Sequence, residues 1–173
     1  MTGTTPRGRF SLSVSLSVAL AVLAAGCASS PSSPHAAASA PVSTSGPGHV
    51  HVDVADVDMT ITNAVAHLDR SGDGSLGMTV RNDDGVPEHL GMVVTPGGGR
   101  GVLVGGKSAE GNGSLSTAGI LLLSGTTVTF GGGSGPRVLL HRVHGVTAAH
   151  TLPVALQFGV AGLVRFQARV ASS

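Results

Sequence analysis

The sequence predicts an all-β protein built as an antiparallel β-sandwich of eight or nine short strands. Over residues 120–170, apolar and polar residues alternate with the two-residue period of a half-buried strand. Glycine-rich segments separate these runs, and glycine supplies the positive φ that tight reversals need. No helix-period segment interrupts the series, and the recurring turn signals are typical of a Greek-key sandwich.

The chain begins with a segment that has the pattern of a signal peptide. Arg7 and Arg9 form a positive n-region, and an apolar stretch diluted by serine follows over Phe10–Ala25. This stretch is shorter than the ~20 residues that a spanning helix needs, and no stop-transfer pattern follows it. We therefore expect Met1–Gly26 to be a targeting segment that is removed, and the mature protein to be extracytoplasmic.

The targeting segment ends in Leu23-Ala24-Ala25-Gly26-Cys27, which resembles a bacterial lipobox. The small residues before the cysteine suit a peptidase cleft. Cys27 is the only cysteine of the chain, so it cannot form an intramolecular disulfide. We expect its thiol to be acylated, for example with palmitate, because several acyl chains together give stable membrane anchoring. An ordinary signal peptide with an incidental cysteine is the alternative.

Residues 28–48 are dominated by Ser, Pro and Ala and show no apolar periodicity. Such a composition cannot bury enough apolar surface to offset its chain entropy. Residues 27–48 are therefore expected to form the lipidated cysteine and a flexible tether, and residues 49–173 the β-sandwich domain.

The first half of the domain begins with Val50, Val52 and Val54, which alternate with polar residues and predict a strand with one apolar face. A loop of small residues over Gly105–Thr117 ends this half. Between the first strand and this loop, polar or glycine-rich turns separate four further expected strands: Met59–Ala66, Gly77–Asn82, His89–Thr95 and Gly101–Val104.

The second half contains four more runs. Aromatic residues make up only 2% of the chain, without Trp or Tyr, so the core must be built from Val, Leu, Ala and a few Phe. The alternation places Phe130, Leu156, Phe158 and Phe166 on the inward faces. The four runs are Ile120–Phe130, Arg137–Val143, Thr151–Phe158 and Leu163–Val170.

The composition excludes some classes of function. Without Arg7 and Arg9 the chain keeps 8 basic against 9 acidic residues, so it has no electrostatic footprint for nucleic acid. No nucleophile elbow, phosphate-binding loop or H-E-x-x-H motif is present, which favours a non-enzymatic binding module.

Two C-terminal runs have distinctive forms: Gly125–Phe130 reads G-x-x-V-x-F, and Leu152–Val170 reads L-P-V-x-L-x-F-x-x-A-G-x-V-x-F-x-x-x-V. Both resemble the last strands of the periplasmic PCu(A)C copper-chaperone family. Met78–Gly85 is similar to the family's strand followed by an Asn-Asp/Gly turn, and His89–Pro96 lies where its D-x-L-x-x-x-x-S/T-P strand falls. The resemblance covers 58–170 and implies a cupredoxin-like sandwich that carries Cu(I).

The resemblance implies copper ligands in two His-x-Met elements and one further methionine, because imidazole and thioether suit Cu(I). The first element would fall near Gly101–Gly106 and the last near Pro136–Leu140, where this chain has Gly-Val-Leu-Val-Gly-Gly and Pro-Arg-Val-Leu-Leu. Met59, Met78 and Met92 all precede both positions. The chain therefore resembles a degenerate member without the His/Met motif, and copper is a possible rather than a certain cofactor.

Histidine offers two substitute metal sites. His49, His51 and Asp53 project from one face of a predicted strand, where imidazole and carboxylate could bind Cu(II) or Zn(II). His141 and His144 lie near the second lost His-x-Met, but a strand would place them on opposite faces, so a chelate needs a bend at Val143–Gly145. The alternative is a solvated outer face for His49, His51 and Asp53, and exposed or capping histidines for His141 and His144.

A third candidate is Asp69–Ser75, which matches the opening of a calcium loop. The twelfth position is Val80, where a bidentate Glu is required, so a plain turn is favoured. The sequence thus predicts a lipid-anchored envelope protein that resembles a copper chaperone and binds metal through histidines weakly or not at all. The alternative is a metal-free module that binds an envelope protein.

Overall fold

The computed structural model describes residues 42–54, 57–107 and 111–172. These residues belong to one compact unit, Pro34–Ser173. The described part contains no α-helix and one short 3-10 turn, η1 (Pro96–Gly98), so the predicted all-β class is confirmed. The strands are β1 (Val42–Gly46), β2 (His49–Val54), β3 (Val57–Leu68), β4 (Gly74–Asn82), β5 (Glu88–Val94), β6 (Arg100–Val104), β7 (Leu115–Ser116), β8 (Gly119–Leu122), β9 (Thr126–Phe130), β10 (Arg137–Leu140), β11 (Thr151–Phe158) and β12 (Leu163–Ser172).

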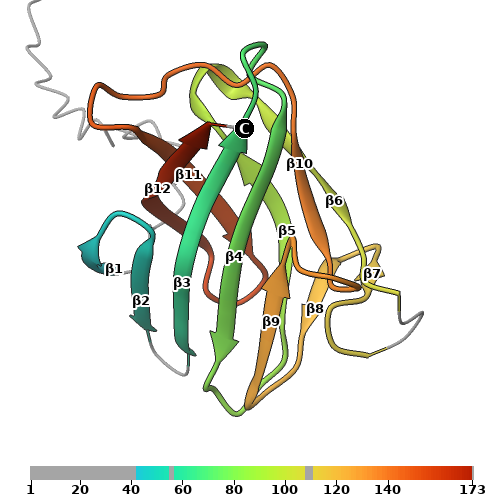
Figure 1. Cartoon of the computed structure of the whole chain (residues 1–173). Coiled ribbons are helices and arrows are strands. Elements are labelled where there is room, and N and C mark those ends of the chain that lie inside the picture. The colour runs from blue at the N-terminus through green and yellow to red at the C-terminus, as the bar shows by residue number, and fades with distance from the viewer. Residues whose placement is uncertain (1–41, 55–56, 108–110, 173) are drawn as a thin grey trace, which may run out of the picture. The chain divides into compact units, whose positions relative to one another are not determined.

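The strands form a sandwich whose two layers are hydrogen-bonded to each other along both edges (Figure 1). The path runs β3–β12–β11–β5–β6–β10–β4 and returns to β3, because β3 also pairs with β4. Every pairing on this path is antiparallel except that of β12 with β3. Closing the path leaves these strands without an open edge, which removes a template for aggregation.

Strand β3 changes its partner halfway along, and a bulge makes this possible. It pairs with β2 over residues 57–61 and with β12 over residues 65–68, with a register shift between Thr62 and Val65. Asn63 takes φ 54°, a left-handed conformation that Asn tolerates better than most residues. Beside the bulge, Gly48 N–H donates to the Gln167 carbonyl at 2.6 Å, and Ala64 N–H donates to the Gly48 carbonyl at 3.1 Å.

The core lies between the layers and consists of the inward residues of nearly every strand. The four side chains predicted to face inward, Phe130, Leu156, Phe158 and Phe166, are all buried, which confirms the period-2 assignment. The largest fully buried side chains outside this set are Met59, Ile61, Leu76, Leu90, Ile120, Leu122, Leu140, Leu152 and Val50.

Strand boundaries differ from the prediction at several places, including the three that follow. The first strand begins at Val42, inside the segment assigned to the tether, because β1 forms backbone pairs with β2 that its composition does not reveal. The run Ile120–Phe130 is two strands, since a turn at Leu123–Gly125 sends β8 to pair with β5 and β9 with β4. The run Arg137–Val143 ends at Leu140, because Arg142 turns the chain with φ 47°.

Candidate functional site

The predicted face of His49, His51 and Asp53 exists on β2. These residues alternate with the buried Val50 and Val52, so their side chains point outward together. His51 lies opposite Thr60 of β3, and its Nδ1 is 3.2 Å from the Thr60 hydroxyl.

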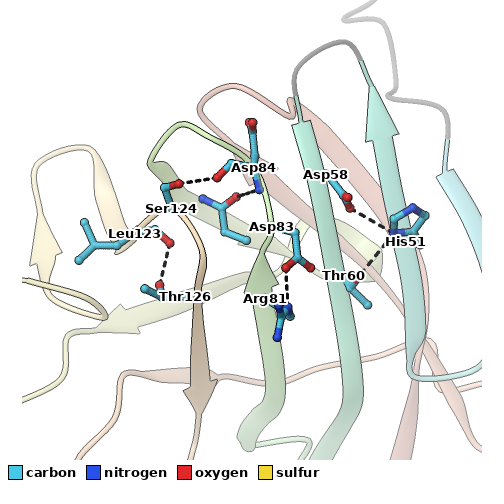
Figure 2. A network of polar contacts seen from close by, with 10 residues as sticks. His51, Asp58, Thr60, Arg81, Asp83, Asp84, Leu123, Ser124 and Thr126 are labelled. Carbon is cyan, nitrogen blue, oxygen red and sulfur yellow. Dashed lines mark hydrogen bonds and ion pairs between the residues drawn. The ribbon is translucent and has the colours of Figure 1, made fainter.

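Asp58 of β3 joins this face and was not predicted from the sequence. It is the cross-strand partner of Asp53, and its Oδ1 lies 3.7 Å from His51 Nδ1 (Figure 2). The two side chains are about half exposed, at 44% for His51 and 56% for Asp58. A sequence signal existed, because Asp58 lies at the start of the strand that follows β2 after a short loop, and strands joined in this way often pair.

The surroundings of His51 are acidic. Asp83 N–H donates to the Asp58 backbone carbonyl at 2.9 Å, which brings the β4–β5 loop with Asp83 and Asp84 to the same end of the sheet (Figure 2). Arg81 partly balances this charge through its Nε, 2.5 Å from Asp83 Oδ1. The local excess of carboxylates favours a cation near His51 over an anion.

The second predicted pair, His141 and His144, lies in the exposed loop after β10 rather than in a strand. The bend that a chelate requires is present, since Arg142 and Gly145 both have positive φ. His141 Nδ1 lies 3.7 Å from Asp73 Oδ1, and the same carboxylate oxygen accepts from Arg142 N–H at 2.7 Å. Asp73 therefore ties this loop to the β3–β4 turn, a long-range contact without a local sequence signal.

Asp69 holds that same turn. Its Oδ1 accepts from Ser71 Oγ at 2.5 Å, Ser71 N–H at 2.8 Å and Asp73 N–H at 3.0 Å. The hydrogen bond from the Ser71 hydroxyl lowers the pKa of Asp69, and the backbone donors act in the same direction. The segment thus serves as the turn between β3 and β4, as favoured above.

None of these sets is assembled as a metal centre. Among the described residues, no three His, Cys, Asp or Glu side chains lie close enough together to hold a metal ion. His51 with Asp58 and His141 with Asp73 are each a pair of possible ligands. Imidazole and carboxylate donors of this kind suit Zn(II) or Cu(II).

The two segments at which the resemblance would place His-x-Met lie side by side. β6 and β10 are antiparallel partners, with Val102 opposite Leu139. Both side chains of this pair face outward, and Val102 is 48% exposed. Met59 and Met78 are buried in the core, and Met92 is half-buried on β5.

One buried carboxylate, Glu88, has a structural role that sequence reasoning missed. It is 3% exposed and accepts hydrogen bonds from the backbone N–H groups of His89, Gly159, Val160 and Ala161 at 2.7–3.0 Å. Three successive amides of a turn form a concavity suited to an anion. Glu88 occupies it and locks the β11–β12 turn to β5. The sequence did contain an indication of this, because Glu88 and Leu90 alternate along one strand and their side chains therefore face the core together.

Cys27 and the predicted targeting segment lie outside the described residues. Among the residues that are described, no helix is long and apolar enough to cross a membrane.

Comparison with known proteins gives matches among solved structures. No protein-family model matches the chain, and no curated protein matches it. The structure titled "Apo PCuAC domain from PmoF1" is similar with a TM-score of 0.55 and 20% identity, over 71% of this chain and 99% of that one.

Two structures of a second domain are also similar. "Copper-bound PCuAC domain from PmoF2" gives a TM-score of 0.52 and 21% identity, over 71% of this chain and 98% of that one. "Apo PmoF2 PCuAC domain" gives 0.51 and 21%, over 66% and 90%. At these identities the likeness shows the fold, and the predicted PCu(A)C-like, cupredoxin-like sandwich is confirmed.

Proposed function

We propose that this protein is a lipid-anchored, extracytoplasmic copper-chaperone-like protein that binds Cu(II) or Zn(II) weakly through His51 and Asp58. The observation that carries the proposal is the 3.7 Å approach of His51 Nδ1 to Asp58 Oδ1 on a sandwich of PCuAC fold. A similar domain is described as copper-bound, which supports copper as the metal to test first.

The ligand chemistry favours the oxidised metal. Imidazole and carboxylate suit Cu(II) and Zn(II), whereas Cu(I) prefers thioether and thiolate sulfur. The thioethers of Met59 and Met78 are buried in the core and face away from this site. Affinity should be low because only two ligands are close and both are about half exposed to water.

Metal titration of residues 34–173 tests this proposal, since this unit contains the complete core. Calorimetry with Cu(II) or Zn(II) should show weak binding that His51→Ala or Asp58→Asn abolishes. His67→Ala, at an exposed position of β3, is the matched control and should leave binding unchanged. Binding should also weaken on acidification, because a protonated imidazole cannot coordinate.

Two other outcomes would redirect the assignment. Binding that survives His51→Ala and disappears in His141→Ala would move the site to the second pair, beside Asp73. Tight Cu(I) binding that survives both His51→Ala and His141→Ala would contradict the proposal.

A second candidate function is a metal-free interaction module. Val102 is exposed, and its outward-facing partner Leu139 is partly buried. With Leu115 (49% exposed) near the end of β6, these side chains put apolar surface where the ligands were expected. Exposed apolar groups that lie together often mark contacts with another protein. The absence of any Cu(I), Cu(II) or Zn(II) binding would favour this function.

The anchor is tested separately. Lipidation of Cys27 should place the mature protein in the membrane fraction, and Cys27→Ala should release it. A wild-type mature protein that begins elsewhere and carries no lipid would contradict the anchor and leave the metal site unaffected.

A further inference from the structure

Some pairs in this chain combine an aspartate or asparagine with a glycine directly after it. In such a pair the backbone nitrogen of the glycine can attack the carbonyl carbon of the preceding side chain, because glycine has no Cβ to hinder the approach. The product is a cyclic succinimide. Ring closure requires that the side chain and the glycine nitrogen can meet, so the fold decides which pair reacts. The pairs are Asp73-Gly74, Asp84-Gly85 and Asn112-Gly113.

The pair Asp84-Gly85 is open to this reaction. It lies in the loop between β4 and β5, where the backbone bends without regular secondary structure. Gly85 is exposed, and apart from its chain neighbours no heavy atom lies within 4 Å of the position that a Cβ would take. The Gly85 N–H donates to Asp84 Oδ1, which brings the attacking nitrogen beside the carboxyl carbon. The pair therefore has the proximity and the room that ring closure needs.

The backbone of Asp84 is held in place while it is exposed to this attack. Its N–H donates to Asn82 Oδ1 at 3.1 Å, and the Ser124 hydroxyl donates to its carbonyl oxygen (Figure 2). Both hydrogen bonds engage the main chain of Asp84 and not its carboxylate. They steady the residue that is attacked without blocking the approach of the Gly85 nitrogen.

The pair Asp73-Gly74 is restrained at both reacting groups. Asp73 Oδ1 accepts from Arg142 N–H at 2.7 Å. Gly74 belongs to β4 and is paired with Leu68 of β3 on one side and Leu140 of β10 on the other. Ring closure would require the carboxylate to leave Arg142 and the glycine to leave its place in the sheet.

The pair Asn112-Gly113 is restrained in a similar way. Asn112 Oδ1 accepts from Leu123 N–H at 2.9 Å, which fixes the side chain that would be attacked. Gly113 N–H donates to the Leu121 carbonyl of β8 at 2.8 Å, so the attacking nitrogen is already engaged. Among the pairs of this kind, Asp84-Gly85 alone is free of such restraints in the fold.

We propose that Asp84 is a site of spontaneous isomerisation to isoaspartate, and that the fold confines the reaction to this pair. The Gly85 nitrogen gives up its proton and forms a bond to Asp84 Cγ, while the protonated carboxyl group loses its hydroxyl, so that one water molecule is released. One water molecule then opens the ring. Opening at the former peptide carbonyl gives isoaspartate, in which the chain continues through Cγ, and opening at Cγ restores aspartate. No other reactant is needed.

The modification should leave the core intact because it is confined to an exposed loop. The main chain between β4 and β5 gains one methylene group, and the Asp84 carbonyl that accepts from Ser124 becomes part of a carboxylate. The adjacent residue, Asp83, donates its N–H to the Asp58 carbonyl at 2.9 Å. Isomerisation therefore alters the spacing of carboxylates at this end of the sandwich without removing a buried side chain.

Peptide mapping of the purified protein during prolonged incubation at neutral pH tests the proposal. Electron-transfer fragmentation distinguishes isoaspartate from aspartate at equal mass, and water enriched in the heavy oxygen isotope labels each ring that opens. The folded protein should accumulate isoaspartate and label at Asp84 and not at Asp73. In urea, where the restraints on Asp73 are lost, the pair Asp73-Gly74 should react at a rate similar to that of Asp84-Gly85.

Gly85→Ala is the matched variant. The position has room for a methyl group and does not adopt a positive φ, so the variant should fold normally. The methyl group hinders the attack, and isoaspartate at Asp84 should form several-fold more slowly. Val86→Ala is the control, since Val86 is 43% exposed and takes no part in the ring, and the rate should stay unchanged. Circular dichroism establishes that each variant is folded.

Several results would overturn the proposal. One is folded protein that forms no isoaspartate at Asp84, or that forms it equally fast at Asp73. Another is a Gly85→Ala variant that reacts at the wild-type rate. If Asp73-Gly74 stays unreactive in urea, the local sequence and not the fold causes the difference, and the proposal fails as well.

Discussion

Replacing Glu88 by Gln should destabilise the fold severely although the side chain keeps its shape. In the wild type, Glu88 Oε1 accepts from His89, Gly159 and Val160, and Oε2 accepts from Val160 and Ala161. A glutamine keeps one acceptor oxygen and turns an NH₂ group toward the remaining donors. At least one buried N–H then loses its acceptor whichever way the amide is oriented, and the others lose a charged acceptor.

The expected magnitude follows from these contacts. A buried donor left without an acceptor costs about 1–3 kcal/mol, and a hydrogen bond to a charged group contributes about 1.5–3 kcal/mol. We therefore expect Glu88→Gln to lower the free energy of unfolding by about 2–5 kcal/mol. Domains of this kind have about 5–15 kcal/mol in total, so the loss would be a large fraction of it.

Urea denaturation of residues 34–173 would measure the change, with hydrogen exchange reporting the amides of Gly159, Val160 and Ala161. Protection should fall most among these amides, because at least one N–H loses its acceptor and the others lose a charged one. Asp58→Asn is the matched control, since that carboxylate is half exposed and should change stability by less than about 0.5 kcal/mol. A Glu88→Gln loss below about 1 kcal/mol would refute the reasoning that the carboxylate organises the β11–β12 turn.

Three further variants test the rest of the fold. Phe158→Ala should lower the free energy of unfolding by about 3–5 kcal/mol, because the ring is 1% exposed; an unchanged melting temperature would contradict its inward position. Gly119→Ala should destabilise the fold in thermal melts, since φ is 117° and a new Cβ would lie 2.2 Å from the Leu90 carbonyl oxygen; a wild-type melt would argue against that close approach. Because folding lowers the pKa of Asp69, its ionised carboxylate stabilises the folded state. This stabilisation is fully present at pH values above the unfolded-state pKa and is lost as the pH falls through the folded-state pKa. Asp69→Asn should therefore be less stable than the wild type at neutral pH, with the difference shrinking in acid; a pH-independent difference would rule out the charge as its cause.

The candidate site was only partly accessible from the sequence. The common face of His49, His51 and Asp53 was predicted correctly, because residues two apart in a strand share a face. The prediction missed Asp58 and Asp73, the carboxylates nearest to His51 and His141. Asp58 comes from the neighbouring strand and Asp73 from a turn distant in sequence, so neither proximity follows from spacing along one strand.

The sequence by itself determined the strand class and the inward faces, because alternation is a local property that each strand carries in its own residues. Phe130, Phe158 and Phe166 are buried for this reason. Tertiary structure decided which strands pair: the parallel contact of β12 with β3 that closes the sandwich, and the division of Ile120–Phe130 between two partners. Backbone hydrogen bonds form equally well between any two extended segments, so the choice of partner depends on how all the inward side chains fill one shared core.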